Sequence, residues 1–147
     1  MARSVADRPR SPPISLPRWI KPQLTKLVDA PPEGSDWLHE IKFDGYRLHA
    51  QLDRGAVQLL TRAGLDWTRK YPAIATAVSS LRAKQAYLDA ELCGVRPDGT
   101  TSFSAIQAAS DAGKSDALVF LVFDLLHVDE ERAQHRSLTE RRAFKSC

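Results

Sequence analysis

The stretch Trp37–Ala50 constrains the fold more than any other part of the sequence, because it joins two alternating runs through a turn signal. Within the first run, Ile41 and Phe43 fall on one side of a period-two pattern and Lys42 falls on the other, as in a β-strand with one buried face. Asp44-Gly45 then predicts the two-residue turn of a β-hairpin, after which the alternation resumes. We therefore expect Lys42 at the end of a strand, close to a sheet edge where a ligand can reach it.

The rest of the chain predicts strands and helices in turn. The expected elements are a strand over 57–61 after a turn at Arg54-Gly55, a helix from Pro72 to Leu81, a strand over 87–95, a short helix over 102–109, a strand over 118–126, and a last helix from Ser137 to Cys147 that opens with the capping box Ser137-Leu-Thr-Glu140. The unbroken apolar character of 118–126 predicts a central strand covered on both faces. Strands linked mostly by hairpins, with helices between them, indicate an α+β fold.

Composition bounds the class of protein. The chain has 147 residues, 43% hydrophobic and 27% charged, which suits one globular domain. Residues 1–17 are basic and rich in proline, so we expect a tail or linker there, followed by one domain over 18–147 onto which the apolar residues of 19–28 pack.

No apolar run is long enough to span a membrane and no secretory core is visible, which predicts a cytoplasmic protein. Cys93 and Cys147 lack disulfide or metal-ligand spacing and read as inert thiols.

Lys42 is a candidate nucleophile only if its surroundings change its protonation. With an ordinary pKa of about 10.4, roughly one lysine amine in two thousand is neutral at pH 7. A nearby cation such as Arg47, partial burial or a metal-bound substrate would raise that fraction. The alternative is an ordinary strand-end lysine that extends to water.

The residues around Lys42 carry a family resemblance. Lys42-Phe-Asp-Gly-Tyr-Arg47 resembles the Lys-x-Asp-Gly-x-Arg motif of covalent nucleotidyltransferases, the superfamily of ATP-dependent DNA ligases, RNA ligases and mRNA capping enzymes. The wider stretch 31–47 and Leu60–Thr68 are most similar to the ligase domain of bacterial DNA ligase D. The resemblance runs from about Pro17 to Phe144. It implies the N-terminal part of an adenylation domain with an ATP-grasp-like nucleotidyltransferase fold, made of antiparallel strands with interspersed helices.

The resemblance also assigns roles to individual residues. It implies that Lys42 forms lysyl-AMP. For the base, it implies that Glu40 recognises adenine with Ile41 beside it in the nucleotide site, and that Phe123 stacks on the ring. For the sugar and phosphates, it implies that Arg47 contacts the sugar, that Glu91 binds the ribose hydroxyls, and that Arg62 contacts the nucleotide or a DNA 5′-phosphate. Taken alone, Glu40 and Arg62 also fit exposed ionic side chains, and Phe123 fits the core. Ala90 stands where the family has glycine in Tyr87-Leu-Asp-Ala-Glu-Leu92.

The implied activity is ATP-dependent sealing of nicked or broken double-stranded DNA, with Mg²⁺ and with end-joining proteins such as Ku as candidate partners, near the bacterial nucleoid. No metal ligands are identified in the sequence. Three family features, a Glu-Gly motif, a lysine pair and an OB-fold domain, do not occur within these 147 residues. Two alternatives therefore stay open: a non-catalytic remnant that binds nucleotide or DNA weakly, and a capping-type guanylyltransferase. We expect a truncated fragment whose own activity is uncertain.

Overall fold

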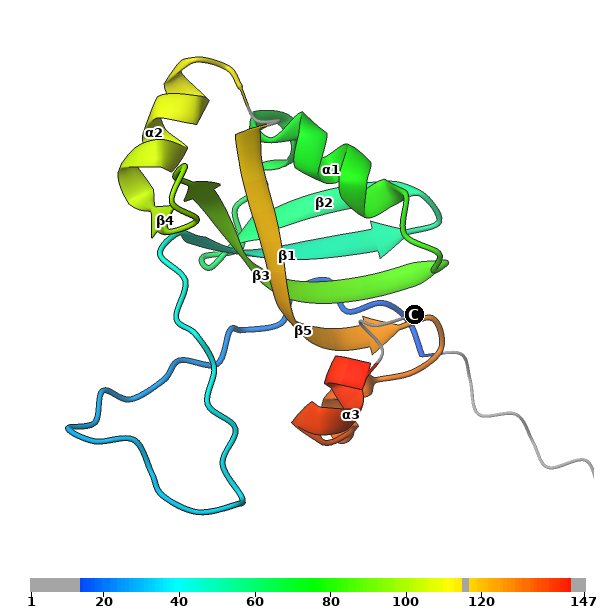
Figure 1. Cartoon of the computed structure of the whole chain (residues 1–147). Helices are drawn as coiled ribbons and strands as arrows, with labels where there is room; N and C mark the ends of the chain where they lie inside the picture. Colours follow the sequence, from blue (N-terminus) through cyan, green and yellow to red (C-terminus); the bar gives the residue numbers. More distant parts are fainter. Residues whose placement is uncertain (1–13, 115–116, 144–147) are drawn as a thin grey trace, which may run out of the picture.

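One antiparallel sheet organises the computed structural model, which describes residues 14–114 and 117–143 (Figure 1). Its strands are β1 (Tyr46–Asp53), β2 (Ala56–Thr61), β3 (Gln85–Val95), β4 (Thr101–Ser102) and β5 (Leu118–Val128). The helices are α1 (Pro72–Ser79), α2 (Phe103–Asp111) and α3 (Leu138–Ala143), with short 3-10 turns at Thr68–Lys70 and Ala133–His135. The presence of both helices and strands, with the strands paired antiparallel, confirms the predicted α+β fold.

Strand β3 is the centre of the sheet. It pairs with β5 on one side and with β1 on the other, from Tyr46↔Leu92 to Asp53↔Gln85. Gly94, near the end of β3, pairs with both β4 and β5, so β4 lies on the same side of β3 as β1. The prediction of a central strand over 118–126 is therefore wrong, because within the described residues β5 pairs with β3 alone and its middle residues are half-buried. An unbroken apolar run favours burial of both faces of a strand, but it does not tell how many strands pair with it.

The apolar face of the sheet forms the core under two helices. Ile74 and Val78 of α1 are buried against Leu48, Ala50 and other side chains of β1, β2 and β3. Figure 1 shows α1 and α2 on this side of the sheet. Helix α2 approaches β3 closely at Gly94, where a β-carbon would lie 2.7 Å from the backbone of α2, so a glycine is required there.

The opposite face of the sheet is polar and is crossed by residues 14–24, which we call the strap. Gln51 on β1 donates hydrogen bonds to the carbonyls of Pro17 at 3.0 Å and Arg18 at 2.6 Å. The Ile20 amide donates to the Tyr87 hydroxyl on β3 at 2.9 Å. The chain then leaves the domain, and Leu27 is fully exposed. The expected packing of residues 19–28 is therefore wrong for the second half of that segment.

The predicted hairpin at Asp44-Gly45 is wrong. Residues 37–44 form no strand, and β1 begins at Tyr46. The side chain of Ile41 is 78% exposed, so the alternation before Lys42 meets no neighbouring strand or core. The hairpin that uses β1 turns instead at Arg54-Gly55, as predicted for the next turn, where both residues have positive φ.

Several local signals are confirmed. Helix α1 begins at Pro72, and the predicted capping box forms: the Ser137 amide donates to Glu140 Oε2 at 2.8 Å, and the Glu140 amide donates to Ser137 Oγ at 3.3 Å. The last helix ends by Ala143 in the described part, and Cys147 and most of the predicted tail over 1–17 lie outside it. Within residues 14–114 and 117–143, no helix has the length and apolar character needed to cross a membrane.

Candidate functional site

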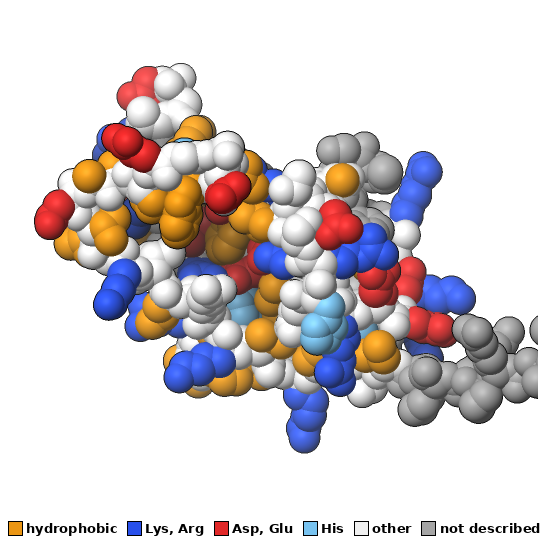
Figure 2. Space-filling view, turned by 90° about the horizontal axis from the view of Figure 1, so that it is seen from below, with side chains coloured by type: hydrophobic (Ala, Val, Ile, Leu, Met, Phe, Trp, Pro, Cys, Tyr) orange, Lys and Arg blue, Asp and Glu red, His pale blue; other side chains and the backbone are white. Residues whose placement is uncertain are grey.

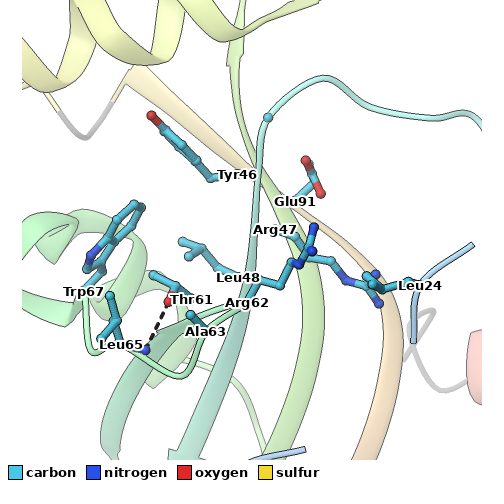
Figure 3. A pocket seen from close by; sticks show the side chains of 11 residues that line it. Leu24, Tyr46, Arg47, Leu48, Thr61, Arg62, Ala63, Leu65, Trp67 and Glu91 are labelled. Carbon is cyan, nitrogen blue, oxygen red and sulfur yellow. Dashed lines mark hydrogen bonds between the residues drawn. The ribbon is translucent and has the colours of Figure 1, made fainter. Parts of the chain in front are cut away.

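A pocket of about 570 Å³ lies where β1 begins, beside β3 and the turn after β2 (Figure 3). Tyr46 and Trp67 lie opposite Arg47 and Glu91 across this pocket. Its remaining lining residues are Leu24, Gly45, Leu48, Thr61, Arg62, Ala63 and Leu65. Apolar and aromatic side chains on one wall and charged side chains on the other are suited to a ligand that carries both a ring and anionic groups. Figure 2, which views the molecule from the side of the polar face, shows acidic and basic side chains interspersed around a hollow.

Arg47 is held from two sides. Its Nε donates to Asp89 Oδ1 at 3.0 Å, its Nη2 donates to Asp89 Oδ2 at 2.7 Å, and its Nη1 donates to the Gln23 carbonyl of the strap at 2.7 Å. The hydrogen bond with Asp89 raises the pKa of Arg47. The guanidinium also lies over the Phe123 ring, 5.3 Å from its centroid. Arg47 therefore presents a fixed cation at the pocket wall.

Two carboxylates on β3 respond differently to burial. Burial alone would raise the pKa of Asp89, but its contacts with His49 and Arg47 outweigh burial and lower it, so Asp89 stays ionised. Glu91 lies two residues further along the same face and lines the pocket. Burial raises the pKa of Glu91, while the charges of Arg47 and Lys42 act in the opposite direction.

Lys42 lies close to the pocket, although it is not one of the lining residues. Lys42 itself is exposed in the segment before β1, yet its charge acts on Glu91 inside the pocket. The chain beside it is fixed at two points. The Asp44 amide donates to Thr101 Oγ1 at 3.0 Å, and Gly45 passes so close to β3 that a β-carbon there would lie 2.2 Å from the Leu92 carbonyl oxygen.

The structure brings some of the predicted site residues together and leaves others apart. Arg47, Arg62 and Glu91 line one pocket. Glu40 is not among the lining residues and forms an ion pair with Arg142 of α3. Ile41 points largely to solvent, and Phe123 lies on β5 against Arg47 rather than among the lining residues. Glu40 is also outside any strand, so no strand face places it beside Lys42.

Aromatic residues that the sequence analysis did not single out form the other wall. Tyr46 packs edge-on against Trp67, with ring centroids 5.4 Å apart, and against Phe103, with centroids 4.5 Å apart. The Lys70 ammonium lies 4.3 Å from the Trp67 ring centroid. The signal for this wall is the run of aromatic and basic residues from Trp67 to Tyr71, which returns the chain to β1 after the β2 turn.

Asp89, His49 and Tyr87 were also missed as members of the site. Each lies on the polar face and is almost completely buried. Their positions were visible as polar residues at every second place in two otherwise apolar strands, which is the pattern of a second covered face. Ala90 points to the apolar face and is fully buried, so its methyl group faces away from Glu91.

A metal site is not preformed in this part of the chain. Among the described residues, no three His, Cys, Asp or Glu side chains gather closely enough to hold a metal ion. Glu91 is the carboxylate that lines the pocket. Mg²⁺ commonly binds through one or two carboxylates together with substrate phosphates, so Glu91 fits the binding of a metal that arrives with a nucleotide.

The fold and the pocket define a small α+β domain with a lysine beside a charged, aromatic-walled cavity. Residues 20–145 match the family model described as ATP dependent DNA ligase domain, and the chain belongs to this family. Among its relatives, the multifunctional non-homologous end joining protein LigD of Pseudomonas aeruginosa is 39% identical over 128 residues, covering 87% of this chain and 15% of that protein. The DNA ligase of Pyrobaculum calidifontis is 32% identical over 138 residues, covering 84% of this chain and 24% of that protein.

Solved structures of related ligases have the same fold. The ligase domain from M. tuberculosis LigD superposes with a TM-score of 0.64 at 33% identity, covering 73% of this chain and 35% of that one. A mycobacterial DNA ligase D complexed with ATP and MES gives a TM-score of 0.63 at 32% identity, again with 73% and 35% coverage. These neighbours confirm the predicted resemblance to the ligase domain of DNA ligase D. The chain spans about a third of those solved ligase domains.

Proposed function

We propose that this chain supplies the nucleophile and part of the nucleotide pocket of an ATP-dependent DNA ligase that works through lysyl-AMP. The observation that carries the proposal is the place of Lys42 in the chain, three residues before Gly45, which lines the pocket with Glu91, and next to a segment that the Asp44–Thr101 hydrogen bond holds. Family membership and the ATP complex of a related ligase support the choice of nucleotide.

In the proposed reaction, the neutral amine of Lys42 attacks the α-phosphorus of ATP. A nitrogen–phosphorus bond forms, the bond to the bridging oxygen of pyrophosphate breaks, and the amine proton passes to solvent. Arg47 is already fixed by Asp89 and the strap, so it can bind the sugar without first losing freedom. Glu91 accepts hydrogen bonds from the ribose hydroxyls, and Arg62, on the turn after β2, faces the phosphates.

The base-binding roles of Glu40, Ile41 and Phe123 stay proposals. Glu40 has to leave Arg142 before it can contact a base. Arg47 covers one face of the Phe123 ring, so adenine would stack on the other face, a contact that contributes about 1–3 kcal/mol and leaves Arg47 in place.

Mg²⁺ would enter with the triphosphate, where it neutralises phosphate charge, and Glu91 is the pocket residue that would contact it. We propose that residues 18–147 act as the first part of an adenylation domain on nicked or broken DNA, in the bacterial cytoplasm near the nucleoid. End-joining proteins such as Ku are candidate partners, since several relatives are named for non-homologous end joining.

Covalent labelling tests this function directly. The full 147-residue chain is incubated with α-labelled ATP and Mg²⁺ and then run on a denaturing gel. We expect an acid-labile label that disappears in Lys42→Arg and persists in Lys84→Arg, a control on an exposed lysine near the start of β3. A chain that binds ATP but never acquires label would support the non-catalytic alternative, and a preference for GTP would support a capping-type enzyme.

A further inference from the structure

A line of buried polar groups runs beneath the strap from Ile20 to Asp89. The Ile20 amide lies 2.9 Å from Tyr87 Oη, and the same oxygen lies 2.9 Å from His49 Nδ1. His49 Nε2 lies 3.3 Å from Asp89 Oδ1, a close polar contact that does not form a hydrogen bond in the structure. His49 is 1% exposed, Tyr87 0% and Asp89 4%, so these three side chains contact one another with almost no access for water.

The donors and acceptors of this line fix its direction. A backbone amide can only donate, so Tyr87 Oη accepts from Ile20 and has its own proton to give to His49 Nδ1. The ring proton of His49 then belongs on Nε2, which faces the Asp89 carboxylate. We assign this tautomer from the network. Each group thereby places the next one, from the strap down to the carboxylate.

The line closes into a ring through Arg47. Asp89 accepts two hydrogen bonds from Arg47, and Arg47 donates back to the strap at the Gln23 carbonyl, three residues after Ile20. The strap is therefore attached at two points to the same polar circuit. Loss of the first attachment would leave Tyr87 without its partner on the strap, and loss of the second would leave Arg47 without its own.

We propose that Tyr87 and His49 are positioning residues for nucleotide binding: together with the strap they orient Asp89 so that Arg47 faces the pocket. The inference rests on the proposed function, because it concerns the orientation of a nucleotide-binding arginine. Apolar side chains would hold the strap on the sheet equally well without the cost of desolvating a histidine, a tyrosine and a carboxylate. The polar circuit ends on the one strand face that also carries Glu91 into the pocket.

The variant Tyr87→Phe removes a single oxygen from this circuit and leaves the ring in place. In the full chain we expect ATP affinity to fall about 3- to 10-fold, the effect of one buried hydrogen bond. Hydrogen exchange at the Ile20 amide should quicken in parallel. Tyr71→Phe is the matched control, because Tyr71 is equally buried, lies outside the pocket lining, and its hydroxyl has no hydrogen-bond partner among residues 14–114 and 117–143. It should change neither quantity.

A double-mutant cycle separates positioning from general stability. If Tyr87 acts through Arg47, Tyr87→Phe should have almost no effect on ATP affinity in an Arg47→Gln background. Equal affinity of Tyr87→Phe and the unmodified chain would overturn the inference, as would the same loss in both backgrounds. Failure of the unmodified chain to bind ATP would overturn the proposed function and this role together, a result distinct from either of those two.

Discussion

Asp89 accepts both hydrogen bonds of a two-pronged contact from Arg47, with its two oxygens 3.0 Å and 2.7 Å from Nε and Nη2. The Asp89 side chain is 6% exposed and that of Arg47 is 23% exposed. Parallel hydrogen bonds of this kind fix the plane of the guanidinium as well as its position. The contact couples the stability of the sheet to the geometry of the pocket.

Replacing Asp89 by Asn should destabilise the fold by about 3 kcal/mol at neutral pH, because it leaves Arg47 partly buried without its counter-charge. The pKa of Asp89 is lower in the fold than in the unfolded chain. Its stabilising contribution is therefore complete above the ordinary aspartate pKa and is lost as pH falls through the lower folded value. Urea unfolding from pH 6 to pH 3 should show the variant and the unmodified chain converging in acid. Asp29→Asn, on an exposed residue, should track the unmodified chain throughout.

Glu91→Gln should have opposite effects on stability and on binding. Burial raises the pKa of Glu91, so the fold favours the protonated carboxyl. The stability that this group contributes is therefore lost as pH rises through its raised folded pKa. The neutral amide removes this loss, so thermal unfolding at pH 7 should move to higher temperature, with no gain at pH 4. ATP affinity should fall about tenfold, because a charged acceptor is replaced by a neutral one. Unchanged affinity would remove Glu91 from the nucleotide site.

Gly45→Ala should disturb the start of β1. Its β-carbon would lie 2.2 Å from the Leu92 carbonyl oxygen, and backbone on both sides has to move. We expect a loss of more than about 2 kcal/mol in urea unfolding together with a loss of labelling at Lys42. Gly99→Ala provides the comparison: it meets open space but has a φ of +84°, so its cost should be about 1 kcal/mol, and labelling should persist. Equal effects of the two variants would contradict the role of close approach.

Arg142→Ala should release Glu40. The pair is about one-third exposed on both sides, and such pairs contribute about 0.2–1 kcal/mol. If Glu40 recognises adenine, its release should tighten ATP binding by up to about fivefold at low salt, and the difference should shrink as salt is added. Arg69→Ala, on an exposed basic residue away from Glu40, serves as the control. Weaker binding in Arg142→Ala would indicate that Arg142 itself belongs to the site.

Local signals predicted the fold well where a few neighbouring residues decide the outcome. Pro72 at a helix start and the Ser137–Glu140 box act within one helical turn, and both are confirmed. The hairpin at Asp44-Gly45 failed because alternation shows that one face of a segment suits burial, but not that a partner strand is present. The partner of β1 on that side is β3, which lies about forty residues further along the chain.

The candidate site was predictable in part for the same reason. The motif over 42–47 named Lys42 and Arg47, and the second similar stretch, Leu60–Thr68, named Arg62. The contact of Arg47 with Asp89 depends on the register between β1 and β3, which no short pattern contains. The aromatic wall likewise forms only when the turn after β2 folds back toward Tyr46.

The hydrogen bond between Asp44 and Thr101 limits how far Lys42 can travel. Lys42 is two residues from this fixed point, so its Cα stays within about 7 Å of the Asp44 Cα in any conformation of the preceding segment. The chain itself therefore holds the Lys42 amine near the pocket. The effective concentration of the amine near the phosphates of a bound nucleotide depends on the length of this two-residue connection rather than on diffusion. A lysine that begins outside the pocket can then serve it without a preformed strand, because the hydrogen bond at Asp44 confines its Cα to that radius.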